Sequence, residues 1–151
     1  MKNIEIDNIR KFTSALFVGD TFDDFRVTEA SFSTLVNISI DGHINREFLG
    51  DEAEDQEAAD GAVAWKDIKP LCYEIIKGQR VPLRFKVVFM MSADQTAQII
   101  QSSNVNGLFL NVRFEEGRLY CTTGTSLKTF SLDKSIDEAW DSYMTAFLAR
   151  I

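Results

Sequence analysis

Apolar side chains occupy alternate positions over most of residues 107–132, and this pattern restricts the fold more than any other feature of the chain. A period of two places those side chains on one face of a β-strand, whereas an α-helix requires a period near 3.6 residues. Glu116-Gly117 interrupts the pattern as a turn, and the polar segment 122–125 interrupts it again. We therefore predict a meander of three antiparallel strands over 107–132.

A second group of alternating segments lies between Phe25 and Phe48. Asp41-Gly42 divides it, and an Asp-Gly pair between alternating segments is a strong hairpin signal, because glycine adopts a positive φ at little cost. We predict a short strand at 4–6, followed by three antiparallel strands near 24–30, 32–40 and 43–49.

Helical periodicity, in which apolar residues recur at every third or fourth position, predicts four helices. They span about 8–17, 65–78, 93–103 and 135–151. In the second of them Pro70 is compatible only with the first turn, where its missing N–H breaks no hydrogen bond. Ser92 with Gln95, and Ser135 with Glu138, have the spacing of capping boxes at the starts of the last two helices.

The helix predicted over 135–151 is amphipathic along its whole length. A continuous apolar stripe needs a surface to cover it, and we expect the chain's own sheet rather than a partner to supply that surface. The stripe comprises Ile136, Ala139, Trp140, Tyr143, Met144, Phe147, Leu148 and Ile151.

The order of these elements suggests an internal duplication. Residues 85–91 are a nearly continuous apolar run, which favours a strand covered on both faces. The chain then consists of two β-α-β-β-β halves, 1–49 and 85–132, separated by an acidic loop at 50–61 and the connecting helix 65–78. We predict a single α+β domain over 1–151, built on antiparallel sheet, with an inserted helix and a C-terminal amphipathic helix.

Composition excludes several classes of protein. A net charge of −7 argues against a general nucleic-acid coat, since phosphates require a positive surface, although it permits a local basic patch. Cys72 and Cys121 lie in apolar patterns without CxxC spacing, so we expect two buried thiols. The N-terminus lacks the apolar core of a signal peptide, and the longest apolar stretch, 87–91, is too short to span a bilayer. We therefore expect a cytoplasmic protein without membrane association.

Positive charge is concentrated in the middle third of the chain, where only Asp67 and Glu74 oppose six basic residues. If the six share a face, they could bind a phosphate, a nucleic-acid backbone or an acidic protein segment. The alternative is a solvated helix face that pairs with the acidic loop 50–61. The predicted ligand- or phosphate-binding residues are Lys66, Lys69, Lys77, Arg80, Arg84 and Lys86.

The sequence contains no catalytic or metal-binding signature. The cluster at 20–24, which holds three aspartates, could bind Mg²⁺ or act as acid and base, but it is also typical of a turn between a helix and a strand. His43 is the only histidine and has no recognisable nucleophile beside it. We predict no catalytic residue, metal or cofactor, and keep as the alternative a small enzyme with scattered polar residues. Its candidate residues are Asp20, Asp23, His43 and Arg80.

Four segments of the chain carry a family resemblance. Residues 25–31, 40–45, 76–82 and 123–127, with the sequences FRVTEAS, IDGHIN, IKGQRVP and TGTSL, resemble an uncharacterised family of small Clostridia-type bacterial proteins. The likeness extends over nearly the whole chain. It implies a bacterial cytoplasmic origin and brings no known activity.

Residues 107–127 are also similar to the strand–turn–strand passage that follows the inner helix of a DNA sliding clamp, within a half-domain that would span 85–132. This resemblance implies two β-α-β-β-β units with their helices side by side. Clamp helices carry basic residues toward DNA, whereas the helix predicted here over 93–103 carries Asp94 and no Lys or Arg. We predict a non-enzymatic binding or assembly module, with a clamp-like assembly as one version, and with a protein, a second copy or nucleic acid as its partner.

Overall fold

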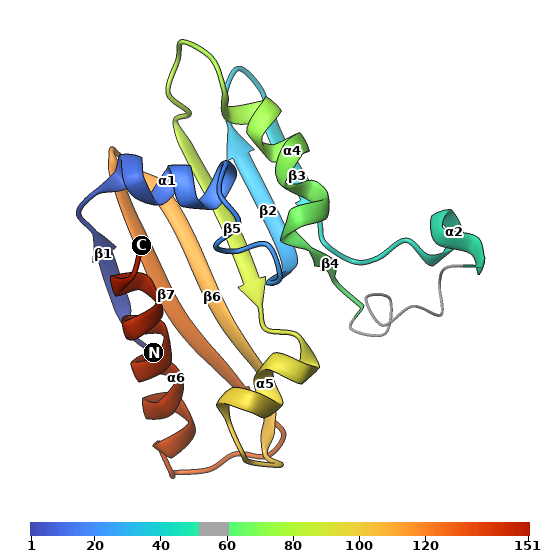
Figure 1. Cartoon of the computed structure of the whole chain (residues 1–151), viewed down its shortest axis with the longest axis vertical. Helices are drawn as coiled ribbons and strands as arrows, with labels where there is room; N and C mark the ends of the chain where they lie inside the picture. The colour runs from blue at the N-terminus through green and yellow to red at the C-terminus, as the bar shows by residue number, and fades with distance from the viewer. Residues whose placement is uncertain (52–60) are drawn as a thin grey trace.

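The structure, a computed structural model, describes residues 1–51 and 61–151. Seven strands within these residues form one sheet in the order β1-β7-β6-β5-β2-β3, with β4 also paired to β2 (Figure 1). Every pair is antiparallel, so the predicted α+β class with antiparallel sheet is confirmed. The strands are β1 (Asn3–Ile6), β2 (Arg26–Ser33), β3 (Asn37–Asp41), β4 (Val63–Ala64), β5 (Arg84–Met90), β6 (Val105–Glu115) and β7 (Arg118–Leu127).

The helices of the described residues are α1 (Ile9–Phe17), α2 (Arg46–Leu49), α4 (Trp65–Ile76), α5 (Ala93–Ile99) and α6 (Ser135–Ala149). Three of them, α1, α4 and α6, cover one face of the sheet, whereas α2 projects away from it (Figure 1). In Figure 1, α1 and α4 cross in front of the sheet, α6 runs beside β7, and α5 lies at the lower end. Residues of α1, α4 and α6 belong to the same buried cluster as the inward-facing residues of the strands, so these three helices lie on one side. No helix of the described residues covers the opposite side.

The core is rich in aromatic side chains because the strands place phenylalanines in register. Phe32, Phe85 and Phe114 lie side by side on β2, β5 and β6, and their ring centroids are 6.2 and 5.4 Å apart. Offset and edge-to-face ring contacts stabilise such layers beyond the area that they bury. Trp65 at the start of α4 is fully buried, and its Nε1–H donates to the carbonyl of Leu16 in α1 at 2.7 Å. This bond joins the two helices over the sheet.

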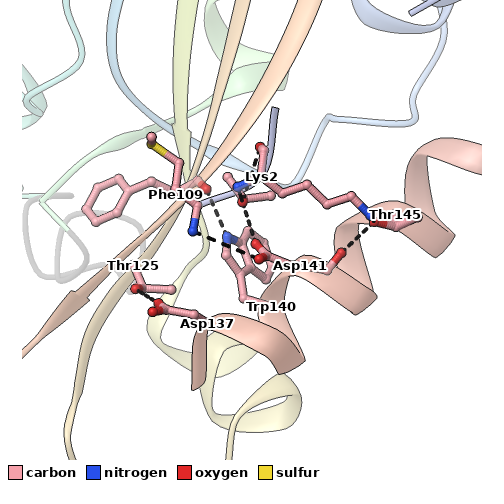
Figure 2. Close-up of polar contacts among 9 residues, drawn as sticks. Lys2, Phe109, Thr125, Asp137, Trp140, Asp141 and Thr145 are labelled. Atoms are coloured by element: carbon pink, nitrogen blue, oxygen red, sulfur yellow. Dashed lines mark hydrogen bonds and ion pairs between the residues drawn. The ribbon is translucent and has the colours of Figure 1, made fainter. Parts of the chain in front are cut away.

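A polar network attaches α6 to the sheet (Figure 2). Trp140 donates from Nε1 to the Phe109 carbonyl at 2.9 Å, and the buried Thr123 hydroxyl donates to the Asp141 carboxylate at 2.5 Å. The Lys2 backbone N–H donates to the same hydroxyl at 2.8 Å, which ties the start of the chain to the network. The prediction that α6 docks on the chain's own sheet is therefore confirmed.

The predicted hairpin tip at Asp41-Gly42 is wrong. The chain turns instead at Thr34–Val36, between β2 and β3, and the predicted strand over 43–49 is replaced by α2. Gly42 still lies against β2, where its N–H donates to the Thr28 carbonyl at 3.0 Å. Gly42 therefore serves a close approach between two backbones rather than a tight turn.

The region 107–132 contains two strands, and the predicted third strand is absent from it. Glu116 and Gly117 both have a positive φ, as expected for the predicted turn. Gly124, however, lies within β7 directly opposite Phe109, and the strand continues to Leu127. Because both predicted third strands are missing, and because β1 and β7 pair in one continuous sheet, the two β-α-β-β-β halves and their clamp-like arrangement are not confirmed.

The remaining predictions on local structure differ mainly at element ends. The capping box of Ser92 and Gln95 is confirmed, but that of Ser135 and Glu138 is not formed, because the Ser135 N–H bonds to Asp133 instead. Pro70 lies inside α4, beyond its first turn. Strand β5 is buried on alternate residues only, so its expected coverage on both faces is wrong. The predicted acidic loop 50–61 falls largely outside the described residues, which omit 52–60.

No helix in the described part of the chain is long and apolar enough to cross a membrane.

Candidate functional site

The sheet face opposite α1, α4 and α6, called here the open face, presents polar and charged side chains in ordered rows. Strand residues on this face alternate with the buried ones that face the helices. The strand registers set one row across β3, β2, β5, β6 and β7 and a second row beside it. The first row is Ser39, Ser31, Lys86, Arg113 and Tyr120, and the second is Asn37, Ser33, Arg84, Glu115 and Arg118.

Two cations face each other in the first row. Lys86 on β5 is directly opposite Arg113 on β6, and like charges at directly opposite positions of an antiparallel pair are destabilising. The Lys86 ammonium is partly compensated by Glu29, at 2.8 Å. Arg84 and Arg113 have no ion-pair or hydrogen-bond partner for their guanidinium groups among the described residues. Arg84 is directly opposite Glu115 on β6, whereas Arg113 is opposite Lys86 and Tyr120 and has no acidic residue opposite it.

A hollow of about 290 Å³ lies beside these cations. It is formed by residues of β2, β3, β5 and β6, and the three cations lie along it. Hydroxyl and amide groups on the open face supply neutral hydrogen-bond donors at the same place. The polar and basic residues that line it are Ser31, Ser33, Asn37, Ser39, Arg84, Lys86 and Arg113, together with Glu115.

The six basic residues predicted from the sequence divide between separate parts of the fold. Arg84 and Lys86 line the hollow on the open face, whereas Lys66 and Lys69 belong to α4 on the helix-covered side. Lys77 ends α4, and Arg80 lies in the connection to β5. Two of the six therefore meet at one site, and they are joined there by Arg113.

Lys69 and Lys77 are engaged by neighbouring acids. The Lys69 ammonium contacts the Asp23 carboxylate at 2.6 Å and the Gly19 carbonyl at 2.7 Å, and its side chain is only 15% exposed. This pair fastens α4 to the connection between α1 and β2. Lys77 lies 2.7 Å from Glu74, and the hydrogen bond and charge of that carboxylate raise the pKa of Lys77.

Among the described residues, no hydrogen bond or ion pair joins the side chains of the four residues considered for an enzyme site, although the Asp23 N–H donates to the Asp20 carbonyl at 3.2 Å within one turn. Asp23 is paired with Lys69, and His43 lies 3.7 Å from Asp41 with both side chains largely exposed. Asp20 and Arg80 lie in separate connections of the chain. Among the residues that the structure describes, no group of three or more His, Cys, Asp or Glu side chains could hold a metal ion.

Sequence reasoning missed Arg113 and the serines of β2 and β3. Arg113 is 27 residues from Lys86 along the chain, and only the β5–β6 register places the two opposite each other. The available signal was the alternation along 107–115, which put Arg113 on the polar face of its strand. Without the register, nothing in the sequence indicated which cation it would face.

Both cysteines are buried free thiols, as predicted. Burial raises the pKa of Cys72 and of Cys121 above the ordinary 9.0, to about 12. A thiol that remains protonated is a poor nucleophile, so neither cysteine is equipped for thiolate chemistry.

We expect both thiols to react slowly with Ellman's reagent at about pH 8 in the native protein and quickly in urea. Because the folded-state pKa exceeds the unfolded one, the unfolded chain loses its thiol protons first, and the free energy of unfolding should fall as the pH rises above about 9. A Cys72→Ala, Cys121→Ala variant should lose that part of the pH dependence. Rapid labelling without denaturant would contradict the expectation.

The comparisons with known proteins identify a family and nothing more specific. A family model described as a family of unknown function (DUF5721) matches residues 15–151. No curated protein and no solved structure matches the chain, and the sliding-clamp resemblance therefore finds no support. Since the match runs from residue 15 to the last residue of the sequence, the chain belongs to the family of unknown function DUF5721.

Proposed function

We propose that this protein is a binding module without catalytic chemistry, and that the hollow on the open face holds a small phosphate-bearing ligand. The observation that carries the proposal is the direct opposition of Lys86 and Arg113 in a hollow that Arg84 also lines. Like charges placed opposite each other reduce the stability of a sheet, and a bound anion would remove that cost. A phosphate group carries the required charge.

The chemistry of the lining suits phosphate. Guanidinium groups donate paired, parallel hydrogen bonds to phosphate oxygens, and an ammonium adds a compact charge. The hydroxyls of Ser31, Ser33 and Ser39 can donate to oxygens that the arginines leave free. Glu115, on the same lining, disfavours a second anion nearby and so favours a ligand with one phosphate-bearing end.

The size and charge of the protein favour a small ligand over a nucleic acid. The hollow, at about 290 Å³, is at the lower end of the range for sites that take small molecules. A net charge of −7 repels a long polyanion over its whole length, whereas a small anion is attracted within about 8–10 Å of the local cations. The enzyme alternative gains no support from its candidate residues, since the Asp23 carboxylate is paired with Lys69 and His43 lies beside Asp41.

The proposal is tested by titrating the protein with pyrophosphate, with binding measured by calorimetry and by the NMR chemical shifts of the backbone amides. We expect shifts centred on β2, β5 and β6, and a dissociation constant that rises at least about ten-fold in Arg113→Gln, since a charge-assisted hydrogen bond contributes about 1.5–3 kcal/mol. The same substitution should raise the free energy of unfolding without ligand by a few tenths of a kcal/mol, because it removes the repulsion with Lys86 (about 0.2–1 kcal/mol).

Arg118→Gln is the matched control. Arg118 lies on the open face in β7, outside the hollow, and is close to Glu5, at 3.9 Å. The Arg118→Gln substitution should leave the affinity for pyrophosphate within about two-fold of that of the unmodified protein, since exposed ion pairs contribute little free energy. Equal losses of affinity in both variants, or no shifts around β5 and β6, would refute the site.

A further inference from the structure

The sheet ends at two edges, at β1 and at β3. No other strand of the described residues pairs with the outer side of β3 (Asn37–Asp41). An exposed edge presents unpaired N–H and C=O groups that can accept another strand. Native sheets suppress this with short strands, lysine, proline or a covering element.

The two edges differ in this respect. β1 has four residues and lies among charged side chains, at Lys2, Glu5 and Asp7. β3, with the sequence NISID, contains no lysine, arginine or proline. Ile38 and Ile40 lie on its helix-covered face and are only partly buried, so their outer sides remain available to a neighbour.

Exposed apolar residues adjoin the β3 edge. Leu35 is 94% exposed and Val36 is 59% exposed, immediately before the strand. Leu83 and Val81 are also largely exposed in the neighbouring connection, which meets β2 where the Leu83 N–H donates to the Ser33 carbonyl at 2.9 Å. The two connections lie together at the upper end of the sheet in Figure 1. Clustered exposed apolar residues of this kind mark interaction surfaces.

We infer that β3 pairs antiparallel with β3 of a second copy, which would join two sheets into one. The strand is complementary to itself about a two-fold axis at Ser39. Ile38 then faces Ile40 of the second copy on the helix-covered side, and Asn37 faces Asp41 of the second copy on the open face. No like charges are opposed, and both residue pairs occur twice because the interface is symmetric.

This self-complementarity favours a second copy over an unrelated peptide. An arbitrary strand would have to match apolar and polar positions at once, whereas two copies of NISID match in the register described. The main-chain hydrogen bonds supply affinity and the alternate side chains supply register, as in other strand additions. The inference does not depend on the proposed phosphate site, because the edge is present without ligand.

Variants at Asn37 give a test whose two arms have opposite signs. Light scattering and sedimentation across a concentration series should show a monomer–dimer equilibrium for the unmodified protein. Asn37→Asp places one carboxylate opposite Asp41 at each end of the symmetric interface and should raise the dissociation constant about five-fold, whereas Asn37→Lys should lower it by a similar factor. Hydrogen exchange of the β3 amides should slow as the protein concentration rises.

Asn106→Asp and Asn106→Lys are the matched controls, because Asn106 is exposed on the interior strand β6 and its side chain contacts Ser126. They impose the same change in net charge away from the edge and should alter the dissociation constant by less than about two-fold. A protein that stays monomeric at every concentration would overturn the inference. The inference would also fail if the variants at Asn37 changed the dissociation constant no more than the control variants at Asn106.

Discussion

Replacing Gly42 with alanine is expected to lower the free energy of unfolding by about 3 kcal/mol or more, or to prevent folding. A Cβ at this position would lie 1.8 Å from the Val27 carbonyl oxygen and 2.6 Å from its carbon. These are backbone atoms of an interior strand and cannot swing aside as a side chain would. Gly42 is also held on two sides, since its N–H donates to Thr28 and its carbonyl accepts from Val63 at 2.9 Å.

Urea unfolding monitored by tryptophan fluorescence measures this effect, with Gly19→Ala as the control. A Cβ at Gly19 would have its nearest neighbours, two backbone atoms of Ala15, at 3.5 Å, which is ordinary contact. That variant should change the free energy of unfolding by less than about 0.5 kcal/mol. If Gly42→Ala unfolds at the same urea concentration as the unmodified protein, the close approach of Gly42 to β2 is wrong.

The Asp41-Gly42 segment also explains where sequence reasoning failed on the first half of the chain. Asp-Gly is a hairpin signal because of the conformations that glycine allows, but glycine is equally required where a backbone passes close to another. Because glycine meets both requirements, the sequence alone does not distinguish a hairpin turn from a close approach of two backbones. The actual turn at Thr34–Val36 contains neither Gly nor Pro, so it gave no local signal.

The second half shows the complementary failure. The alternation along β6 and the Glu116-Gly117 turn were predicted because both depend on neighbouring residues only. The polar segment 122–125 predicted a break at Gly124, which instead lies inside β7, opposite Phe109. A Cβ at Gly124 would lie 3.8 Å from the Phe109 Cβ, which is ordinary contact, so glycine here marks no turn and no close approach. Only the pairing of the two strands shows that β7 continues through this position.

The candidate site depends on the same long-range information. Arg84 and Lys86 were selected because they belong to a cluster in the sequence, yet Lys69 of that cluster is bound to Asp23 on the other side of the sheet. Proximity along the chain grouped residues of a helix with residues of a strand. The cation that faces Lys86 is Arg113, and sheet register alone brings it there.

The docking of α6 was predictable because an amphipathic helix carries its own signal, and Trp140 is the residue on which that docking most depends. Trp140 is fully buried, and its Nε1–H donates to the Phe109 carbonyl at 2.9 Å (Figure 2). Trp140→Ala should lower the free energy of unfolding by about 3–5 kcal/mol, since it removes a large buried ring and leaves a cavity. Trp140→Phe keeps most of the volume and should lose about 1–3 kcal/mol, because the Phe109 carbonyl loses its donor.

Tyr143→Ala is the control that distinguishes the loss of the buried Trp140 ring from a general weakening of α6. Tyr143 lies on the same helix, stacks on Trp140 with ring centroids 5.7 Å apart, and is 38% exposed. It lacks a buried hydrogen bond to the sheet among the described contacts, so its loss should lower the free energy of unfolding by only about 1–1.5 kcal/mol. Denaturant unfolding of the three variants should therefore rank Trp140→Ala as the most destabilised. If Tyr143→Ala lowers the free energy of unfolding as much as Trp140→Ala, then α6 is held by its whole apolar stripe rather than by one buried residue.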